Sequence, residues 1–201
     1  QMKKLKKRFI VPAVVFILSM CALIGLIYIV GKSQEQQNRT NAKLNAMTYA
    51  ERINGELMEG IGVTDTLKQV VISGDGNING FYDVAANMMD DSIQSIQIAP
   101  NGVVTEIYPE EGNESGKIDL INDSDRGEIS RYARDNDTVI MQGPLELKQG
   151  GYGIAVRNPV YVEDENGQKS FWGFTIVILK VPEIFSDSVE ALSNFGYKYC
   201  L

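Results

Sequence analysis

A long uncharged segment near the N-terminus limits what this chain can become. Residues 9–30, FIVPAVVFILSMCALIGLIYIV, hold 22 positions without a charge. A helix of that length extends roughly 33 Å, which matches a bilayer hydrocarbon core of about 30 Å. Pro12 falls in the first turn of such a helix, where it costs little. We therefore expect residues 9–31 to form one transmembrane helix.

The charges that flank this segment predict its orientation. Residues 3–8, KKLKKR, contribute five cations, whereas only Lys32 follows closely on the other side. Because positively charged flanks stay in the cytoplasm, we expect residues 1–8 to be cytoplasmic and the chain from Lys32 onward to lie outside. The segment is longer than the apolar part of a secretory signal, and its exit YIVGKS lacks an A-x-A pattern. An uncleaved anchor is therefore favoured over a signal peptide.

The part of the chain expected outside the cytoplasm is acidic. It carries all 26 Asp and Glu residues against 14 of the 19 Lys and Arg residues, a formal charge of about −12. This excess argues against nucleic-acid binding and against docking on anionic lipid. The chain has no His, Cys21 lies in the expected anchor and Cys200 is next to the last residue. We therefore expect no disulfide in the exposed domain, no metal and no other cofactor.

The residue inventory also argues against an enzyme. Without His the usual acyl-transfer triads cannot be built, and no GxSxG motif is present. Residues 74–80, GDGNING, have glycines spaced like a phosphate-binding loop but lack the Lys-Ser/Thr pair that such a loop needs. We expect this segment to be a simple connecting loop and the chain to have no catalytic residues.

Helical periodicity follows the anchor. Residues 32–61 are polar and suited to a stalk helix, with one apolar stripe at three- and four-residue steps: Leu44, Met47, Ala50, Ile53, Leu57 and Ile61. The stripe can pack on the chain's own domain, which is the commoner case, or pair with a second copy as a coiled coil. Further helices are expected at 64–72 and 81–91, separated by the glycine-rich residues 73–80.

From residue 93 onward the apolar period changes to two. This pattern predicts five strands, at 93–99, 103–108, 139–147, 153–162 and 170–181. Asn101-Gly102 is a strong hairpin signal that is expected to set the register of the first two strands, because both residues tolerate positive φ.

Two more helices complete the expected α+β domain. One is expected at 123–135, capped by Asp123 or Ser124 with Ile129 and Tyr132 facing inward, and the last opens at Pro182. The resulting order of helix, hairpin, helix and three-stranded meander is that of a PAS-like domain with a five-stranded, mostly antiparallel sheet.

More specific segments resemble one family. They are APNGVVTEIYP, GN at 112–113, IDL at 118–120, GPLELKQGGYGIAVRNPVY and FWGFTIVI. In this order they are similar to the CHASE domain, the extracellular sensory domain of bacterial histidine kinases, of cyclic-dinucleotide enzymes such as diguanylate cyclases, and of plant cytokinin receptors. The resemblance covers residues 46–185. It implies an anchor helix, a stalk helix and two PAS-like halves, then a second membrane helix and a cytoplasmic output domain.

This chain departs from that family plan at its end. It stops at YKYCL, about where a second half would begin, and Gln1 precedes Met2. The sequence is therefore interpreted either as a fragment or as a minimal sensor. We expect a sensor domain at residues 62–185, and a last helix with the start of a truncated second half at residues 186–201.

Arg157 is the first candidate for ligand binding. It stands on a strand that is otherwise apolar or small, where a guanidinium would give a bidentate grip on a carboxylate or phosphate group. The alternative is a charge at the strand edge that faces water. The resemblance favours the binding role slightly, because it places an Arg in this pattern.

Asp119 is the second candidate. In plant members of the family the matching segment supplies an acid to the ligand, so the resemblance implies that Asp119 accepts hydrogen bonds from an amine or amide. A local Asx turn is the simpler role and is slightly favoured. A loop stiffened by Pro109 and bent at Gly112 and Gly116 is expected to hold Asp119 near the sheet face that carries Arg157.

Three further residues complete the candidate ligand site. Tyr152 and Trp172 either line a pocket or fill the core, and core packing is the commoner fate of a Trp whose indole N–H still needs a partner. Gly151 suits a backbone turn, although a residue without Cβ also lets its N–H approach a ligand.

Together these features predict an extracytoplasmic sensor anchored in a bacterial cell membrane. It would bind a small polar or zwitterionic ligand between sheet and helices, act as a homodimer, and pass the signal to a cytoplasmic kinase or cyclase. The alternative is a membrane-anchored module for protein interaction or dimerisation that has no small ligand.

Overall fold

The computed structural model describes residues 2–110, 118–147, 151–164, 166–181 and 183–194, and the chain divides into two compact units, residues 1–50 and 51–201. Helix α1, Met2–Ser73, begins in the first unit, and from Glu51 it is the first element of the second. Side chains between Ile10 and Val30 are exposed almost throughout. The helix from Ile10 onward contains a stretch that is long and apolar enough to cross a membrane, by length and composition.

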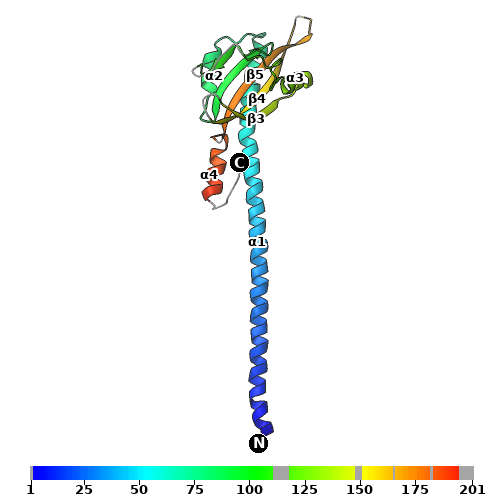
Figure 1. The fold of residues 1–201 in the computed structure, drawn as a ribbon, viewed down its shortest axis with the longest axis vertical. Helices are drawn as coiled ribbons and strands as arrows, with labels where there is room; N and C mark the ends of the chain where they lie inside the picture. The colour runs from blue at the N-terminus through cyan, green and yellow to red at the C-terminus, as the bar shows by residue number, and fades with distance from the viewer. Residues whose placement is uncertain (1, 111–117, 148–150, 165, 182, 195–201) are drawn as a thin grey trace. The chain divides into compact units, whose positions relative to one another are not determined.

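The second unit is built on a single five-stranded sheet (Figure 1). Its elements are α2 Phe81–Met88, β1 Ile93–Pro100, β2 Glu106–Tyr108, α3 Gly127–Asn136, β3 Ile140–Glu146, β4 Tyr152–Glu163, β5 Lys169–Val181, the 3-10 turn η1 Glu183–Phe185 and α4 Ser186–Asn194. The strand order is β2-β1-β5-β4-β3, and every neighbouring pair is antiparallel. The predicted α+β class, the five strands and the helix between the second and third strands are confirmed.

The two faces of the sheet bury two separate apolar clusters. On one face Val156, Val177 and their neighbours pack against Leu67 of α1 and Phe81 of α2. We call this the α1 face. On the other, the α3 face, the cluster includes Ile140, Phe174, Ile176, Leu120 and Ala133. Cross-strand register fixes these assignments, because side chains directly opposite each other in neighbouring strands point to the same face.

Helix α1 runs through the point where a break was expected. The sequence predicted separate helices at 32–61 and 64–72, but one helix continues to Ser73. Gly60 lies where α1 meets β5: a Cβ there would come within 2.7 Å of the Leu179 side chain. The glycine therefore permits close helix–sheet packing instead of ending the helix.

The predicted hairpin is only partly confirmed. Asn101 and Gly102 both have positive φ, 54° and 84°, as the Asn-Gly pair predicts. The β1–β2 ladder, however, extends only to the pair Ile98 and Glu106, so residues 99–105 form a longer connection. Val103 instead makes an isolated bridge to Asp119. The turn residues therefore do not set the register directly, because the chain between turn and ladder pairs elsewhere.

Helix α3 begins four residues later than expected, at Gly127. Asp123 caps the preceding turn, where its Oδ1 accepts hydrogen bonds from the backbone N–H groups of Asp125 and Arg126. The inward side of the helix consists of Gly127, Ser130 and Ala133. Ile129 still packs against the α3-face cluster, but the inward position predicted for Tyr132 is wrong, since that side chain is 58% exposed. Pro182 lies outside the described residues.

Candidate ligand-binding site

Arg157 lies in the middle of β4 on the α3 face. It pairs across the sheet with Ile140 of β3 and Ile176 of β5, both members of the α3-face cluster. Only 2% of Arg157 is exposed, so the alternative of an edge charge facing water does not describe its position. Because alternate side chains of a strand point to opposite faces, the position of Arg157 in β4 places its positive charge in the interior.

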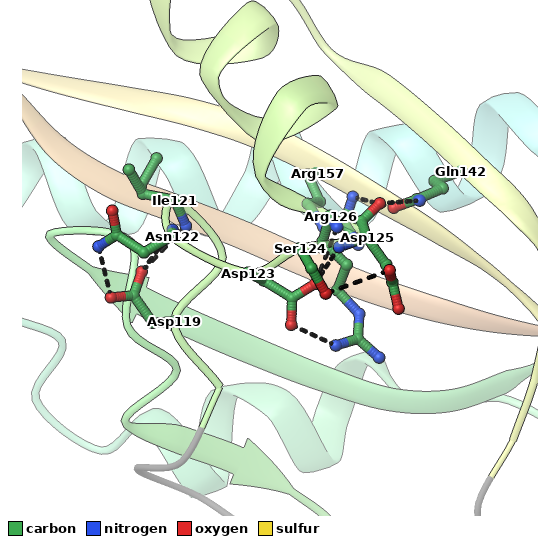
Figure 2. Close-up of polar contacts among 9 residues, drawn as sticks. All are labelled: Asp119, Ile121, Asn122, Asp123, Ser124, Asp125, Arg126, Gln142 and Arg157. Atoms are coloured by element: carbon green, nitrogen blue, oxygen red, sulfur yellow. Dashed lines mark hydrogen bonds and ion pairs between the residues drawn. The ribbon is translucent and has the colours of Figure 1, made fainter.

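A chain of hydrogen bonds links this arginine to the turn that precedes α3. Arg157 Nη1 donates to Gln142 Oε1 at 2.7 Å, and Gln142 Nε2 donates to the carbonyl oxygen of Asp125 at 3.3 Å. Figure 2 shows the guanidinium between β3 and that turn, beside Arg126. The neutral Gln142 side chain therefore orients the cation without balancing its charge.

Two buried polar atoms at this level of the structure lack hydrogen-bond partners. Within the described residues, neither Arg157 Nε nor Ser130 Oγ has one. Ser130 is fully buried on the side of α3 that faces the sheet, and α3 packs against β3 and β4. Buried donors are nearly always satisfied in folded proteins, so two orphans beneath one helix call for an explanation.

The electrostatic environment of Arg157 is unfavourable to a cation. Burial, helped by the positive charge of Arg126, lowers the pKa of Arg157 to about 10, and the carboxylate of Asp123 opposes this only in part. Asp123 is already engaged by Arg126, with 3.0 Å between Oδ2 and Nη1. Arg157 therefore remains charged at neutral pH, in a place that would favour a negative group.

Other polar side chains lie across the same face. Gln97 stands in the cross-strand row of Arg157, separated from it by Ile176 and thus by two strand spacings, or roughly 10 Å. It is 8% exposed, and its Nε2 donates to Ser95 Oγ at 2.9 Å. Between these polar groups the face carries small Ala155, opposite Ile178. The arrangement offers donors and acceptors on both sides of a narrow apolar strip.

Asp119 lies on the same side of the sheet but is occupied locally. Its Oδ1 accepts hydrogen bonds from the N–H groups of Ile121 and Asn122 at 3.0 and 3.1 Å, and its Oδ2 accepts one from Asn122 Nδ2 at 2.7 Å. The bond from the Asn122 side chain, followed by those from the backbone, lowers the pKa of Asp119. In Figure 2 its carboxylate points to Asn122, while Arg157 points to Gln142. The structure therefore does not bring the two charges into contact, and Gly112 and Gly116 lie outside the described residues.

The other predicted site residues lie away from Arg157. Trp172 packs against the α1-face cluster, and its Nε1 donates to the carbonyl oxygen of Gly76 at 3.0 Å. Tyr152 is the first residue of β4 and is 56% exposed, five residues or about 17 Å from Arg157 along the strand. Gly151 precedes it with φ of 79° and open space at its Cβ position. A shared pocket of all five predicted residues stays a prediction without a contact to support it.

A second polar cluster lies directly behind Arg157, on the α1 face. The next residue, Asn158, is 1% exposed and points to that face, where its Nδ2 donates to Asp65 Oδ1 at 2.6 Å and its Oδ1 accepts from Lys68 Nζ at 3.3 Å. Its cross-strand neighbour Thr175 donates to the carbonyl oxygen of Thr64 at 2.9 Å. Helix α1 is therefore hydrogen-bonded to β4 through the side chains of Asp65 and Lys68, and to β5 through the carbonyl oxygen of Thr64.

The residues that surround Arg157 were missed by sequence reasoning. Gln142 could have been found from the strand register, since it lies two residues beyond Ile140 and therefore on the same side of β3. Ser130 could have been found from the spacing of Gly127, Ser130 and Ala133, a row of small residues that marks the side of a helix held close to a sheet. Among the described residues, no group of three Asp, Glu, Cys or His side chains is placed to hold a metal ion.

Comparison with known proteins adds a family and a fold. A model of the CHASE domain matches residues 79–197. No curated protein matches the sequence. Among solved structures, an extracellular ligand binding receptor from Desulfohalobium retbaense DSM5692 is similar, with a TM-score of 0.56 and 12% identity. The match covers 73% of this chain but only 26% of that receptor, so at this identity it shows the fold alone.

Proposed function

This chain belongs to the CHASE domain family, and we propose that it is the ligand-sensing input of a membrane-anchored receptor. Residues 79–197 match that family of extracellular sensory domains. The proposal adds that a small polar or zwitterionic ligand binds between β4 and α3, with Arg157 as its anchor. It further places the segment from Ile10 in a bacterial cell membrane and the output, a kinase or a cyclase, in the cytoplasm.

One observation carries the proposal. Arg157 is buried on the face that α3 covers, and its Nε has no hydrogen-bond partner among the described residues. Keeping a cation in that state lowers the stability of the empty domain, because a buried charge needs a partner. A role in recognising a ligand explains why the charge is there, and a purely structural arginine would be expected to have its donors satisfied.

The neighbouring residue supplies a route from the ligand to α1. Arg157 and Asn158 are adjacent on β4 and point to opposite faces, and Asn158 is bonded to Asp65 and Lys68 of α1. A ligand that pulls on the Arg157 side chain would therefore change the position of β4 against α1. Such coupling requires that the ligand bind one arrangement more tightly than the other.

Thermal unfolding of the full chain in detergent tests the binding proposal. Trp172 is the only tryptophan and is half-buried against the α1-face cluster, so its fluorescence reports unfolding of the second unit. A library of small polar compounds is expected to contain one that raises Tm for the wild type and not for Arg157→Ala. A compound that stabilises both equally would remove Arg157 from the site.

A second experiment tests the coupling. With such a compound bound, amide hydrogen exchange in residues 51–73 of α1 is expected to change in the wild type. In Asn158→Ala the compound is expected to bind with unchanged affinity but to leave exchange in α1 unaltered. Loss of binding in Asn158→Ala, or an undiminished response in α1, would contradict the proposed route.

Pairing of two copies is a further part of the proposed function. Leu44 and Met47 on the expected stripe are 56% and 53% exposed, which leaves apolar surface free for a second copy. A module that only dimerises, with no ligand, remains the competing function. Sedimentation of the full chain in detergent, compared with Leu44→Lys, tests pairing: the wild type is expected to be dimeric and the variant monomeric.

A further inference from the structure

Among the described residues, the buried arginine has no negative partner. No described carboxylate lies within ion-pair distance of Arg157, and its only described side-chain acceptor is the neutral amide oxygen of Gln142. The carboxylate of Asp123 raises the pKa of Arg157, but it is already held by Arg126 and by the turn before α3. In the part of the chain that the structure describes, the positive charge beneath α3 is therefore not compensated.

The second observation is Ser130, which lies on α3, the helix packed against β3 and β4, and whose hydroxyl has no partner among the described residues. A serine inside a helix usually returns its hydroxyl to a carbonyl oxygen three or four residues earlier. Ser130 does not, although it is fully buried on the sheet-facing side of α3. Its hydroxyl is therefore a second free donor, presented from α3, while Arg157 Nε is presented from β4.

We propose that the site between β4 and α3 takes an oxyanion, with Arg157 Nε–H and Ser130 Oγ–H donating to two of its oxygen atoms. This inference rests on the proposed function and names the class of its ligand. An anion both balances the buried charge and satisfies the two orphan donors, whereas a neutral polar group would leave the charge uncompensated. Gln142 acts as a positioning residue, because it holds Nη1 and leaves Nε free.

A carboxylate matches this donor set better than a phosphate does. A carboxylate presents two oxygens in one plane, which suits two donors, and a guanidinium binds such a group in a planar geometry. A phosphate presents further oxygens that would need additional donors once they are buried. Both remain members of the same chemical class, so the experiment has to separate them.

The experiment measures Tm of the full chain in detergent, by Trp172 fluorescence, with acetate or inorganic phosphate replacing chloride at constant ionic strength, or with acetamide added to the chloride buffer. Acetamide has nearly the shape of acetate without its charge. The variants are Arg157→Met, Ser130→Ala and, as a control for the loss of one positive charge, Arg39→Met. Arg39 is exposed and pairs only with Glu35 among the described residues, one turn away on α1.

Acetate is expected to raise Tm of the wild type and of Arg39→Met, to have a smaller effect in Ser130→Ala and none in Arg157→Met. Acetamide is expected to have no effect. Without any added anion, Arg157→Met is expected to melt at a higher temperature than the wild type. Stabilisation by phosphate alone, lost in Arg157→Met, would support the oxyanion but assign it to a phosphate source.

Two results would overturn the inference. One is an unchanged Tm of the wild type with both acetate and phosphate, and the other is an equal response of Arg157→Met. If a neutral compound then stabilised the wild type and not Arg157→Met, the proposed ligand site would stand and only the anionic class would fail. If every stabilising compound acted equally on both proteins, the proposed site itself would fail.

Discussion

The two faces of the sheet treat neighbouring polar residues in opposite ways. On the α1 face, Asn158 is bonded to Asp65 and Lys68, and Thr175 is bonded to Thr64. On the α3 face, the adjacent Arg157 has one side-chain partner among the described residues, and its Nε has none there. Satisfied buried groups stabilise one arrangement of the chain, whereas unsatisfied ones store free energy that a ligand can release.

This difference separates a buried polar residue that stabilises the fold, Asn158, from one that is available to a ligand, Arg157. Both residues are almost completely buried, so burial alone does not distinguish them. The distinction lies in whether the surrounding elements provide partners. Helix α1 supplies hydrogen-bond partners to Asn158 and Thr175. Helix α3 covers the other face with small residues, among them Ser130, whose hydroxyl has no partner in the described part of the chain.

The largest expected effect comes from loosening the packing of the α1 face. Leu67 of α1 is fully buried in the α1-face cluster, and Leu67→Ala is expected to lower the free energy of unfolding by about 2–5 kcal/mol, because it leaves a cavity. The matched control is Met58→Ala, an apolar side chain of the same helix that is 52% exposed, expected to change it by less than about 0.5 kcal/mol. Chemical denaturation of the full chain measures both, and equal effects would refute the packing of α1.

Substitutions at Arg157 and at Asn158 should change the free energy of unfolding in opposite directions. Asn158→Ala is expected to lower the free energy of unfolding by about 1–3 kcal/mol, since it removes a buried group whose partners remain. Arg157→Met is expected to raise the free energy of unfolding by about 1–4 kcal/mol in the absence of ligand, since it replaces an unpaired buried charge by an apolar chain of similar length. A destabilising Arg157→Met would mean that the arginine is a structural residue and would erase the contrast between the faces.

Two hydroxyls provide a finer comparison. Thr175→Val removes a buried bond of 2.9 Å to the Thr64 carbonyl and is expected to cost about 1 kcal/mol. Ser130→Ala removes a hydroxyl with no described partner and is expected to stay within about 0.5 kcal/mol of the wild type. The shift of each variant's urea midpoint from that of the wild type measures the two effects. A loss of stability in Ser130→Ala as large as that in Thr175→Val would show that the Ser130 hydroxyl has a partner in the folded protein.

The smallest effect concerns pH and the turn at Asp119. The pKa of this carboxyl is lowered in the folded protein, chiefly by the Asn122 side chain, so its contribution is fully present above the unfolded pKa of about 3.9. That contribution is lost as pH falls through the still lower folded pKa. The difference in Tm between the wild type and Asp119→Asn is therefore expected to shrink in acid. A difference that is constant with pH would show that the carboxylate does not stabilise this turn.

Most of the fold could be predicted from local patterns in the sequence. The five strands follow from alternation, and β4 and β5 were placed to within one residue at each end because both are long and strongly apolar. The break expected between the predicted helices at 32–61 and 64–72 is wrong, because one helix runs through to Ser73. Whether a glycine ends a helix or lets it approach a sheet depends on Leu179, more than a hundred residues away.

The site was less predictable than the fold. Arg157 stood out as a lone charge in an apolar strand, but its surroundings depend on the start of α3, and Asp123 and Ser124 both offered earlier caps. The observed α3 begins at Gly127, with Ser130 buried and Tyr132 exposed. Gln142 has no distinguishing pattern of its own, because its role arises only from pairing between β3 and β4.

Hydrogen exchange of the full chain in detergent, with and without acetate, tests whether the α3 face binds the ligand. Backbone amides in residues 123–136 and 153–159 are expected to exchange more slowly when acetate is present, and no such change is expected in Arg157→Met. Protection that is absent from these segments, or that is identical in the variant, would contradict the assignment of the α3 face as the ligand-binding side of the sheet.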